Sequence, residues 1–423
     1  MNHSSNRTKR RISAGCALTL APLAVGLASC SVGSGGNPLA GAPYDASNQI
    51  SVSAGEEGAV VDPSRPLKVT ATGDEGRIAD VTAVDTAGRF LSGKLSEDGK
   101  RWQSTTPLAA GVRYTVRIST ENGSGEQGRR TLNFQTKPAH AKRLGVTFGP
   151  DSGTYGVGQP ITAELSHKIK GAKQRKLVEG GLIVKSSPHV EGSWHWVDGK
   201  ELHYRPKEYW PAHSTISVRS RLNGLKVRDG LYGDKAEPVK LKTGDRVEAL
   251  ADASGLSMKF SKNGKVIKEM PITTGKAGFE TRNGTKVILG RESFVRMRSG
   301  SVGIGGGESY DLGVHWASRL TWSGEYVHAA PWSSGSHGVS NSSHGCTGMS
   351  TENAQWFFEH VRNGVPVKYV NSDGDTMPAF GNGFGDWNLS WAKWKEGSAV
   401  QRGTQDQDAA GSATGVSRLR PQV

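Results

Sequence analysis

The chain has 423 residues, a length that predicts about three domains at roughly 100–200 residues each. Its 53 Lys and Arg exceed its 39 Asp and Glu, which gives a formal net charge of +14, and its 57 glycines favour turn-rich β-structure over a helix bundle. No apolar run free of Gly and Pro reaches about 18 residues, so a polytopic membrane protein is excluded, and three cysteines exclude a disulfide framework.

Residues 1–30 have the pattern of an export signal. Four Lys or Arg side chains within residues 7–11 precede the apolar stretch 12–27. This stretch ends in Leu27-Ala28-Ser29-Cys30, which resembles a bacterial lipobox, so we expect Cys30 to be lipidated and to anchor the chain on the outer face of the cell membrane, facing the cell wall. An ordinary secretory signal that contains a cysteine is the alternative, and Arg10-Arg11 leaves twin-arginine export open.

Two segments with regularly spaced turns follow a linker. Residues 31–48 are rich in Gly, Ser, Ala, Pro and Asn and predict a flexible linker. In residues 49–137 apolar and polar side chains alternate, as in 112–118, and turn signals recur about ten residues apart, which is typical of an immunoglobulin-like sandwich. Residues 138–243 repeat this pattern and predict a second sandwich.

Within the second segment, two shorter patterns give local predictions. Asp198-Gly199 lies between two alternating runs and predicts a two-residue hairpin turn with positive φ at both positions. The segment 168–176 carries five Lys or Arg and predicts a solvated loop.

Residues 244–371 predict a third, mainly β unit with one helix. Asn263-Gly264 predicts a hairpin turn. Ser350 is a candidate N-cap for the helix, and Gly364 is a candidate terminator. The apolar residues between them have helical spacing: Ala354, Phe357, Phe358 and Val361.

The C-terminal part divides into a Trp-rich segment and a polar tail. Trp387, Trp391 and Trp394 lie in residues 372–396, and their spacing predicts a strap docked on the preceding domain, with a sugar-stacking platform as the alternative. Residues 397–423 have no aromatic side chain and predict a disordered tail.

A candidate nucleophile lies near the predicted helix. If Cys30 is lipidated, Cys346 is the free thiol of the exported chain, and such a thiol is either reactive or buried and inert. A thiol reacts as the thiolate and needs a base. His328 ends a predicted strand 18 residues upstream, and a loop of this length can return to it, so we predict His328 as the general base. His344 is closer in sequence, but two-residue spacing seldom points a ring at the sulfur.

The same segment holds candidate groups for stabilising an oxyanion. Gly345 has no side chain, so the amides around Gly345 and Cys346 can approach a reacting carbonyl. The hydroxyl of Tyr310 is a further candidate donor to the same oxygen, and His344 is a further candidate for an orienting or oxyanion-stabilising residue.

The run from His328 to Ser343-His344-Gly345-Cys346 resembles the active-site motif of L,D-transpeptidases of the YkuD type. The resemblance extends to Thr274-Gly275-Lys276 and to Ser323-Gly324-Glu325-Tyr326-Val327, and with the order of domains it covers roughly residues 49–396. It implies a mainly β fold, with two immunoglobulin-like sandwiches followed by a YkuD-type catalytic domain over residues 244–371.

The resemblance also implies an activity. Cys346 would attack a diaminopimelate carbonyl of a peptidoglycan tetrapeptide donor, D-Ala would leave, and the amine of a second diaminopimelate would resolve the thioester into a 3→3 cross-link. Carbapenem-type β-lactams would be inhibitors, and no cofactor is implied.

Further residues take their roles from the resemblance. The backbone carbonyl of Ala329, where the family usually has Ser, would orient His328, and Tyr310, Ser323 and Gly324 match substrate-binding positions. Gly348 replaces the usual Asn or Arg, so a side-chain contact to the substrate is expected to be missing.

Three alternatives stay open at this point. Hydrolysis by an L,D-carboxypeptidase would use the same residues, and a catalytically weak wall-binding lipoprotein would fit Gly348. A zinc site is the third; it would draw on His328, His337, His344 and Cys346, but these lack a compact ligand spacing. For an exported chain, the charge of +14 fits anionic wall polymers better than nucleic acid.

Overall fold

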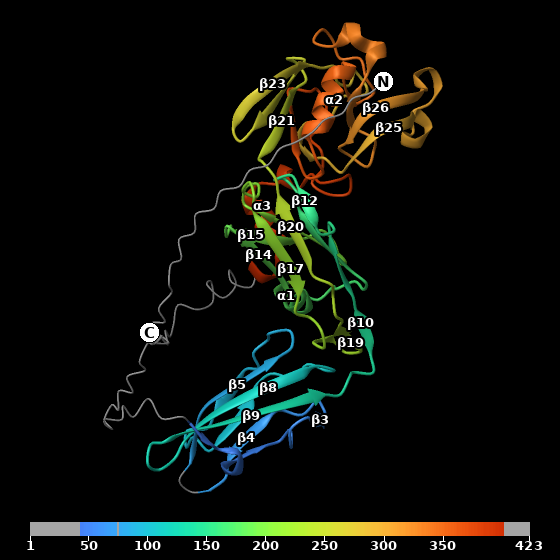
Figure 1. Cartoon of the computed structure of the whole chain (residues 1–423). Helices are drawn as coiled ribbons and strands as arrows, with labels where there is room; N and C mark the ends of the chain where they lie inside the picture. The colour runs from blue at the N-terminus through green and yellow to red at the C-terminus, as the bar shows by residue number, and fades with distance from the viewer. Residues whose placement is uncertain (1–42, 74–75, 402–423) are drawn as a thin grey trace, which may run out of the picture. The chain divides into compact units, whose positions relative to one another are not determined.

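The computed structural model describes residues 43–73 and 76–401, and its fold is mainly β, as predicted (Figure 1). No helix in this part of the chain is long and apolar enough to cross a membrane. The predicted signal peptide with Cys30, most of the linker and most of the tail lie outside the described residues.

The first unit is a two-sheet sandwich. One sheet contains β1 (Tyr44–Asp45), β3 (Val60–Val61), β5 (Arg77–Asp85), β8 (Arg113–Glu121) and β9 (Gln127–Thr136). The other contains β2 (Ile50–Val52), β4 (Lys68–Ala71), β6 (Gly93–Leu95) and β7 (Arg101–Ser104). Alternate residues of β8, including Val116 and Ile118, are fully buried in the core.

The predicted linker ends earlier than expected. Strand β1 pairs in parallel with β9, the 3-10 turn η1 (Ser47–Gln49) follows, and Ala46 between them is fully buried. The folded chain therefore begins before residue 49, because backbone pairing and burial of one small side chain outweigh the loop-like composition.

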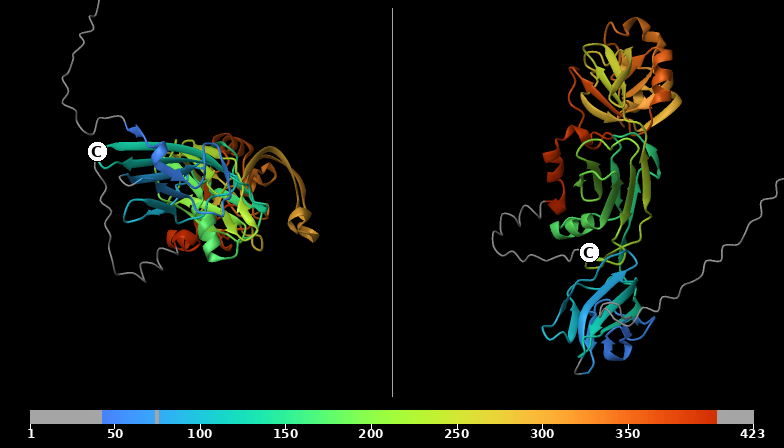
Figure 2. Two further views of the ribbon diagram at one scale, coloured as in Figure 1. Left: turned by 90° about the horizontal axis from the view of Figure 1, so that it is seen from below. Right: turned by 60° about the vertical axis from the view of Figure 1, so that its left-hand side comes forward.

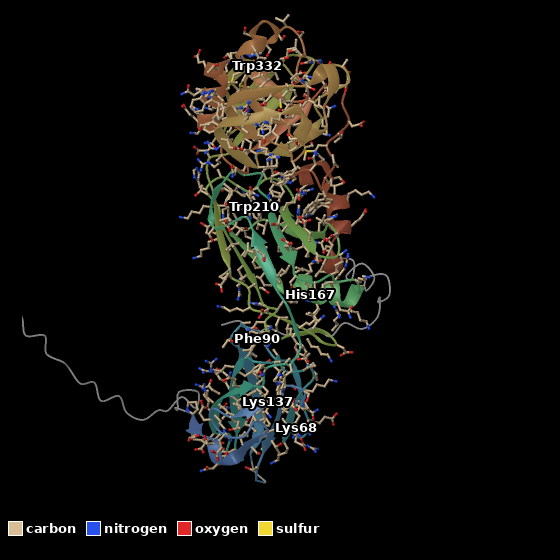
Figure 3. The ribbon with its side chains drawn as sticks, turned by 90° about the vertical axis from the view of Figure 1, so that its right-hand side faces the viewer. Lys68, Phe90, Lys137, His167, Trp210 and Trp332 are labelled. Carbon is tan, nitrogen blue, oxygen red and sulfur yellow. The ribbon has the colours of Figure 1, made fainter. Side chains whose placement is uncertain are left out.

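The second unit is also a sandwich. One sheet orders β11 (Val146–Gly149), β13 (Ile161–Leu165), β16 (Glu201–Pro206) and β15 (Gly192–Trp196); the other orders β12 (Gly153–Tyr155), β20 (Val239–Thr243), β17 (Thr215–Ser220) and β14 (Leu182–Ser187). A small sheet adds β10 (Lys142–Leu144), β19 (Leu231–Gly233) and β18 (Lys226–Arg228). Trp210, labelled in Figure 3, is buried in the core and donates its indole N–H to the Gln159 carbonyl.

Two local predictions in this unit were wrong. The cationic segment is not a loop: helix α1 (Ala172–Gly180) forms from good helix formers and buries Val178 and Glu179. Asp198-Gly199 has no positive φ. The Asp198 carboxylate instead accepts hydrogen bonds from the backbone N–H groups of Lys200 and Glu201, which closes a longer turn.

The third unit has two sheets and one long helix. The first sheet orders β23 (Lys265–Pro271), β22 (Ser257–Lys262), β21 (Val247–Asp252), β29 (Pro366–Val370) and β24 (Gly284–Val287); the second orders β25 (Gly290–Arg298), β26 (Asp311–Arg319), β27 (Tyr326–Ala329) and β28 (Thr347–Met349). Helix α2 (Thr351–His360) shares a core with both sheets through Phe260, Val327 and Phe357. The β25–β26 connection contains the 3-10 turns η2 (Ser299–Val302) and η3 (Gly306–Glu308), and η4 (Pro331–Ser336) follows β27.

The local predictions here were confirmed with one change. Asn263 and Gly264 have φ of 50° and 81° between β22 and β23. Ser350 caps α2 by accepting a hydrogen bond from the Asn353 N–H. The helix ends at His360, one residue before Val361, which is buried in an extended conformation, so Gly364 is not its terminator as predicted.

The Trp-rich strap contacts the preceding unit, as predicted, through hydrogen bonds between the Asn388 side chain and the backbone of Thr285 on β24, but its tryptophans pack on the second sandwich. Its elements are η5 (Asp386–Asn388) and α3 (Trp391–Glu396), and Figure 2 shows α3 in red beside green strands of the second sandwich. The Trp394 indole N–H donates to the Ser193 carbonyl. The Arg205 guanidinium lies 4.6–5.5 Å from the ring centroids of Trp387, Trp391 and Trp394, so the indoles cover a buried arginine instead of offering a sugar platform.

The predicted disordered tail begins too early. The Ser398 hydroxyl and the Ala399 N–H both donate to the buried carboxylate of Glu179 in α1. Residues 397–401 are therefore held by the second sandwich, and the pairing of Glu179 was not visible in the composition of the tail.

Candidate active site

His328 lies on β27, whose four residues are all buried. Its Nδ1–H donates to the carbonyl of Ala329 at 2.8 Å, which is the contact expected of Ala329, and this fixes Nε2 as the basic ring atom. Burial lowers the pKa of His328 below its usual value, although the Ala329 carbonyl acts in the opposite direction. The imidazole is therefore neutral at neutral pH and able to accept a proton.

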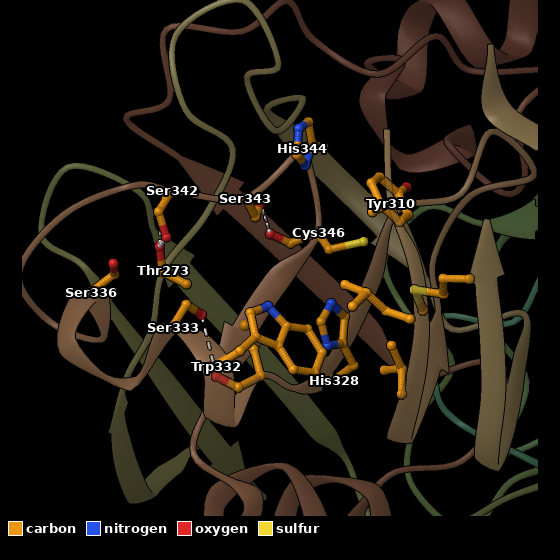
Figure 4. Close-up of a pocket in the computed structure, with 15 residues that line it drawn as sticks. Thr273, Tyr310, His328, Trp332, Ser333, Ser336, Ser342, Ser343, His344 and Cys346 are labelled. Atoms are coloured by element: carbon orange, nitrogen blue, oxygen red, sulfur yellow. Dashed lines mark hydrogen bonds between the residues drawn. The ribbon is translucent and has the colours of Figure 1, made fainter. Parts of the chain in front are cut away.

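Cys346 directly precedes β28, the parallel neighbour of β27. The register pairs His328 with Gly348, so Cys346, two residues before Gly348, projects on the same side of the sheet as His328. Both residues line one cavity of about 370 Å³, and Figure 4 shows the sulfur between the His328 and Tyr310 rings.

The resting nucleophile is a neutral thiol. Burial raises the pKa of Cys346 to about 11, and the backbone N–H of Tyr326 only partly offsets this effect. The thiol donates to the carbonyl of Gly324, 3.4 Å from Sγ. Activation therefore requires the thiol to leave Gly324 and give its proton to Nε2 of His328.

Sequence reasoning missed Trp332, which covers the base. Its ring stacks on His328 with centroids 5.9 Å apart and planes 26° apart, and its side chain also lines the cavity. The signal was an aromatic residue shortly after His328, but only the folded η4 turn brings the two rings together.

His344 lines the cavity of the nucleophile, but its ring is paired with an acidic side chain. Its Nε2 lies 2.6 Å from Oε2 of Glu308, which also pairs with Lys276 at 2.7 Å. The ring packs against Tyr310 in a tilted arrangement, with centroids 5.3 Å and planes 37° apart, and in Figure 4 it lies on the far side of Cys346 from His328. His344 therefore ties the β25–β26 connection to the catalytic loop. Glu308 was missed because it lies in a Gly-rich segment without a local signal.

Gly345 has a structural reason to be glycine, but its amide is already engaged. Its φ of +111° lies in the left-handed region. Its N–H donates to the Ser343 hydroxyl at 3.1 Å, and its carbonyl accepts from Thr281. The Gly345 amide would have to give up this hydrogen bond to act as an oxyanion donor, so its role stays a prediction, and the Cys346 N–H and the Tyr310 hydroxyl are the other candidates.

Ser323 and Gly324 line a neighbouring cavity of about 360 Å³, which does not include His328 or Cys346. Both the backbone N–H and the hydroxyl of Ser323 are hydrogen-bonded to the side chain of Asn382, which belongs to the segment leading into the strap. Tyr310 lines this cavity and the first one, so it lies where the two adjoin.

Gly348 is close-packed. A Cβ at this position would lie 2.9 Å from the Ala330 Cβ and 3.0 Å from the Thr273 Cγ2. The absent side chain is therefore required by packing, and the expectation that Gly348 merely lacks a substrate contact is incomplete.

The described residues contain no group of three or more His, Cys, Asp or Glu side chains that could hold a metal ion. The zinc alternative therefore has no ligand set in this part of the chain.

Comparisons with known proteins agree with this geometry. Residues 247–368 match the family described as the L,D-transpeptidase catalytic domain, and residues 58–226 match the bacterial Ig domain. The chain is 34% identical to L,D-transpeptidase 2 of Mycobacterium tuberculosis over 93% of this chain and 97% of that protein. It is 30% identical to L,D-transpeptidase 5 of the same species, over 82% and 76% of the two chains. The solved structure of L,D-transpeptidase LdtMt1 with imipenem is 31% identical, covers 54% of this chain and 99% of its own, and has a TM-score of 0.47.

Proposed function

Because the chain belongs to the L,D-transpeptidase family, we propose that it forms 3→3 cross-links between peptidoglycan stem peptides through a cysteine thioester. The observation that carries the proposal is the neutral pair of Cys346 and His328 in one cavity, with Nδ1 of the base fixed by Ala329. Two further features support it: the adjoining cavity and the phenol of Tyr310 between the two.

In the acylation step, Nε2 of His328 takes the thiol proton as Sγ of Cys346 attacks the carbonyl of the L-centre of diaminopimelate. The Cys346 N–H and the Tyr310 hydroxyl stabilise the tetrahedral oxyanion. The carbon–nitrogen bond then breaks, His328 returns the proton to the leaving amine, and D-Ala departs with both hydrogens it needs.

In the second step, the side-chain amine of another diaminopimelate attacks the thioester. His328 accepts a proton from this amine, the carbon–sulfur bond breaks, and the proton passes to the thiolate of Cys346. The new amide is the 3→3 cross-link. If water attacks instead, the same residues perform L,D-carboxypeptidase hydrolysis. His328 would accept one proton from water just as it does from the amine, so it does not distinguish the two nucleophiles.

Inhibition and location are parts of the same proposal. A carbapenem presents a strained lactam carbonyl to Cys346, and ring opening leaves the acyl group on the sulfur without a departing fragment. Lipidation of Cys30, supported by the lipobox-like Leu27-Ala28-Ser29-Cys30, would place the enzyme on the outer face of the cell membrane beside its substrate.

The test is mass spectrometry of muropeptides after incubation of the purified protein with disaccharide-tetrapeptides, with a Cys346→Ser variant as control. The expected products are 3→3 dimers and free D-Ala, formed only with the native thiol. If tripeptide forms without dimer, the protein is an L,D-carboxypeptidase and not a transpeptidase. If the tetrapeptide stays unchanged, both activities are contradicted.

A further inference from the structure

Behind the nucleophile lies a buried ion pair that the reaction described above does not use. Lys286 on β24 has a fully buried side chain, and its Nζ lies 2.8 Å from Oε2 of Glu325. Burying two charges is unfavourable unless their environment compensates, so a pair in this position requires an explanation.

The environment of Lys286 leads directly to the nucleophile. Its Nζ lies 4.1 Å from the ring centroid of Tyr369, whose hydroxyl is 2.6 Å from Oγ1 of Thr347, the residue after Cys346. Within the described residues the ammonium has no conventional hydrogen bond beyond its ion pair with Glu325. Its charge is thus available to act through the protein on nearby groups.

Glu325 is connected to the sulfur by the backbone. It lies between Gly324, whose carbonyl accepts a hydrogen bond from the thiol, and Tyr326, whose backbone N–H is hydrogen-bonded to the sulfur. The second carboxylate oxygen of Glu325 accepts from the Arg282 N–H and lies 3.3 Å from the Arg282 guanidinium. Two cations and one carboxylate therefore surround the segment on which the sulfur rests, which leaves a net positive charge when Lys286 is protonated.

We propose that Lys286, held by Glu325, is a positioning residue that stabilises the thiolate of Cys346 through its buried positive charge. The catalytic use of this charge rests on the proposed function, but the effect itself is on the ionisation of the Cys346 thiol. No atom of Lys286 touches the substrate; the ammonium lowers the free energy of the thiolate–imidazolium state that forms when His328 takes the proton.

The charges of Lys286 and Cys346 act on each other's pKa in the direction that the proposal requires, whereas Glu325 acts against it on Cys346. Burial lowers the pKa of Lys286 to about 8, although Glu325 acts to raise it, and a charge on Cys346 would raise it further. Reciprocally, Glu325 raises the pKa of Cys346, and Lys286 lowers it by a smaller amount. The other titratable groups that face Lys286 are Arg282, which acts to lower the pKa of Lys286, and Tyr369, whose own pKa is raised far above its usual value by burial.

The experiment measures the rate of alkylation of Cys346 by iodoacetamide between pH 6 and 9.5, by intact mass, without any peptidoglycan substrate. In the native protein the logarithm of the rate is expected to rise with pH and to bend near pH 8, where Lys286 loses its charge. In Lys286→Met the rate at pH 7 is expected to be about tenfold lower, which corresponds to about one pKa unit, and the bend to disappear. The exposed Lys259→Met is the matched control and is expected to keep the native profile.

A native rate and a native bend in Lys286→Met would overturn the proposal. If Lys286→Met is not recovered as folded protein, Glu325→Gln provides the test, because Glu325 raises the pKa of Lys286 and its removal is expected to lower that pKa. A bend at lower pH in Glu325→Gln supports the proposal, and an unchanged bend contradicts it. Since no substrate is present, failure of cross-linking with the expected alkylation profile would reject the proposed function and leave this inference intact.

Discussion

Cys346 and His328 share one transferable proton as thiol and neutral imidazole, because burial opposes charge on both side chains. Replacing the sulfur by oxygen raises the pKa of the nucleophile and widens its difference from the pKa of His328, so proton transfer to the base becomes less favourable. We expect Cys346→Ser to lose carbapenem acylation by at least about 100-fold, the lower end of the usual effect of general-base catalysis. Intact-protein mass after incubation measures this, and a persistent adduct on the Ser variant would reject Cys346 as the nucleophile.

Gly348 gives a prediction that the structure reverses. From the sequence, Gly348→Asn is expected to restore a substrate contact and to raise acylation or leave it unchanged. The contacts that a Cβ would make with Ala330 and Thr273 predict instead a loss of about 1–3 kcal/mol in the free energy of unfolding and slower D-Ala release.

The controls for this prediction separate packing from substrate binding. Thermal melts and kcat/KM are compared for Gly348→Asn and Gly348→Ala, since both variants carry the Cβ and only one carries the amide. An Asn variant that is as stable as the native protein and faster would show that the loop relaxes around the new side chain.

At the scale of elements, helix α2 depends on its N-cap residue, Ser350. The Ser350 hydroxyl accepts a hydrogen bond from the Asn353 N–H at 3.2 Å, one of the four N–H groups that a helix leaves without internal partners. We expect Ser350→Ala to lower the free energy of unfolding by about 1 kcal/mol, and Ser350→Asp to retain most of it. Chemical denaturation of the three proteins measures this, and equal losses in Ala and Asp would show that the cap itself contributes little.

The elements that the sequence predicted are those with local physical causes. Asn263-Gly264 forms its turn because both residues tolerate positive φ, and Ser350 starts α2 because its side chain replaces a backbone partner. Cys346 and His328 were found because a reactive thiol needs a base and the loop between them is long enough to close.

The features that the sequence did not predict depend on contacts between distant segments. Glu179 binds the start of the tail from more than two hundred residues away. Lys286 on β24 meets Glu325, the residue before β27, only in the folded chain. The cationic run that extends into α1 concealed the buried side of that helix. No periodicity in a single segment carries information of this kind.

Across the molecule, the strap is attached to the second sandwich by a buried cluster that includes His203. Its Nδ1 lies 2.7 Å from Asp386 of the strap, and its Nε2 lies 2.8 Å from Glu201 on the same strand. Burial alone would lower the pKa of His203, but the charges and hydrogen bonds of Asp386 and Glu201 outweigh burial and raise it to about 9. The imidazolium is therefore the form that holds the strap at neutral pH.

The consequence for stability has a definite sign. An unfolded histidine has a pKa near 6.5, so the folded state binds the proton more tightly, and this contribution is fully present below about pH 6.5 and is lost as the pH rises to about 9. Lys286 acts with the opposite sign, because its pKa is lowered on folding and its contribution to stability therefore increases above about pH 8.

A variant comparison isolates the histidine from Lys286 and from every other group. We expect the native protein to be more stable than His203→Gln at pH 6, by an amount that shrinks steadily between pH 6.5 and 9.5, because glutamine keeps a hydrogen bond but carries no charge that titrates. Urea denaturation at fixed ionic strength across this range measures the difference. A difference that stays constant with pH would show that His203 is neutral in the folded protein and that Asp386 holds the strap without an ion pair.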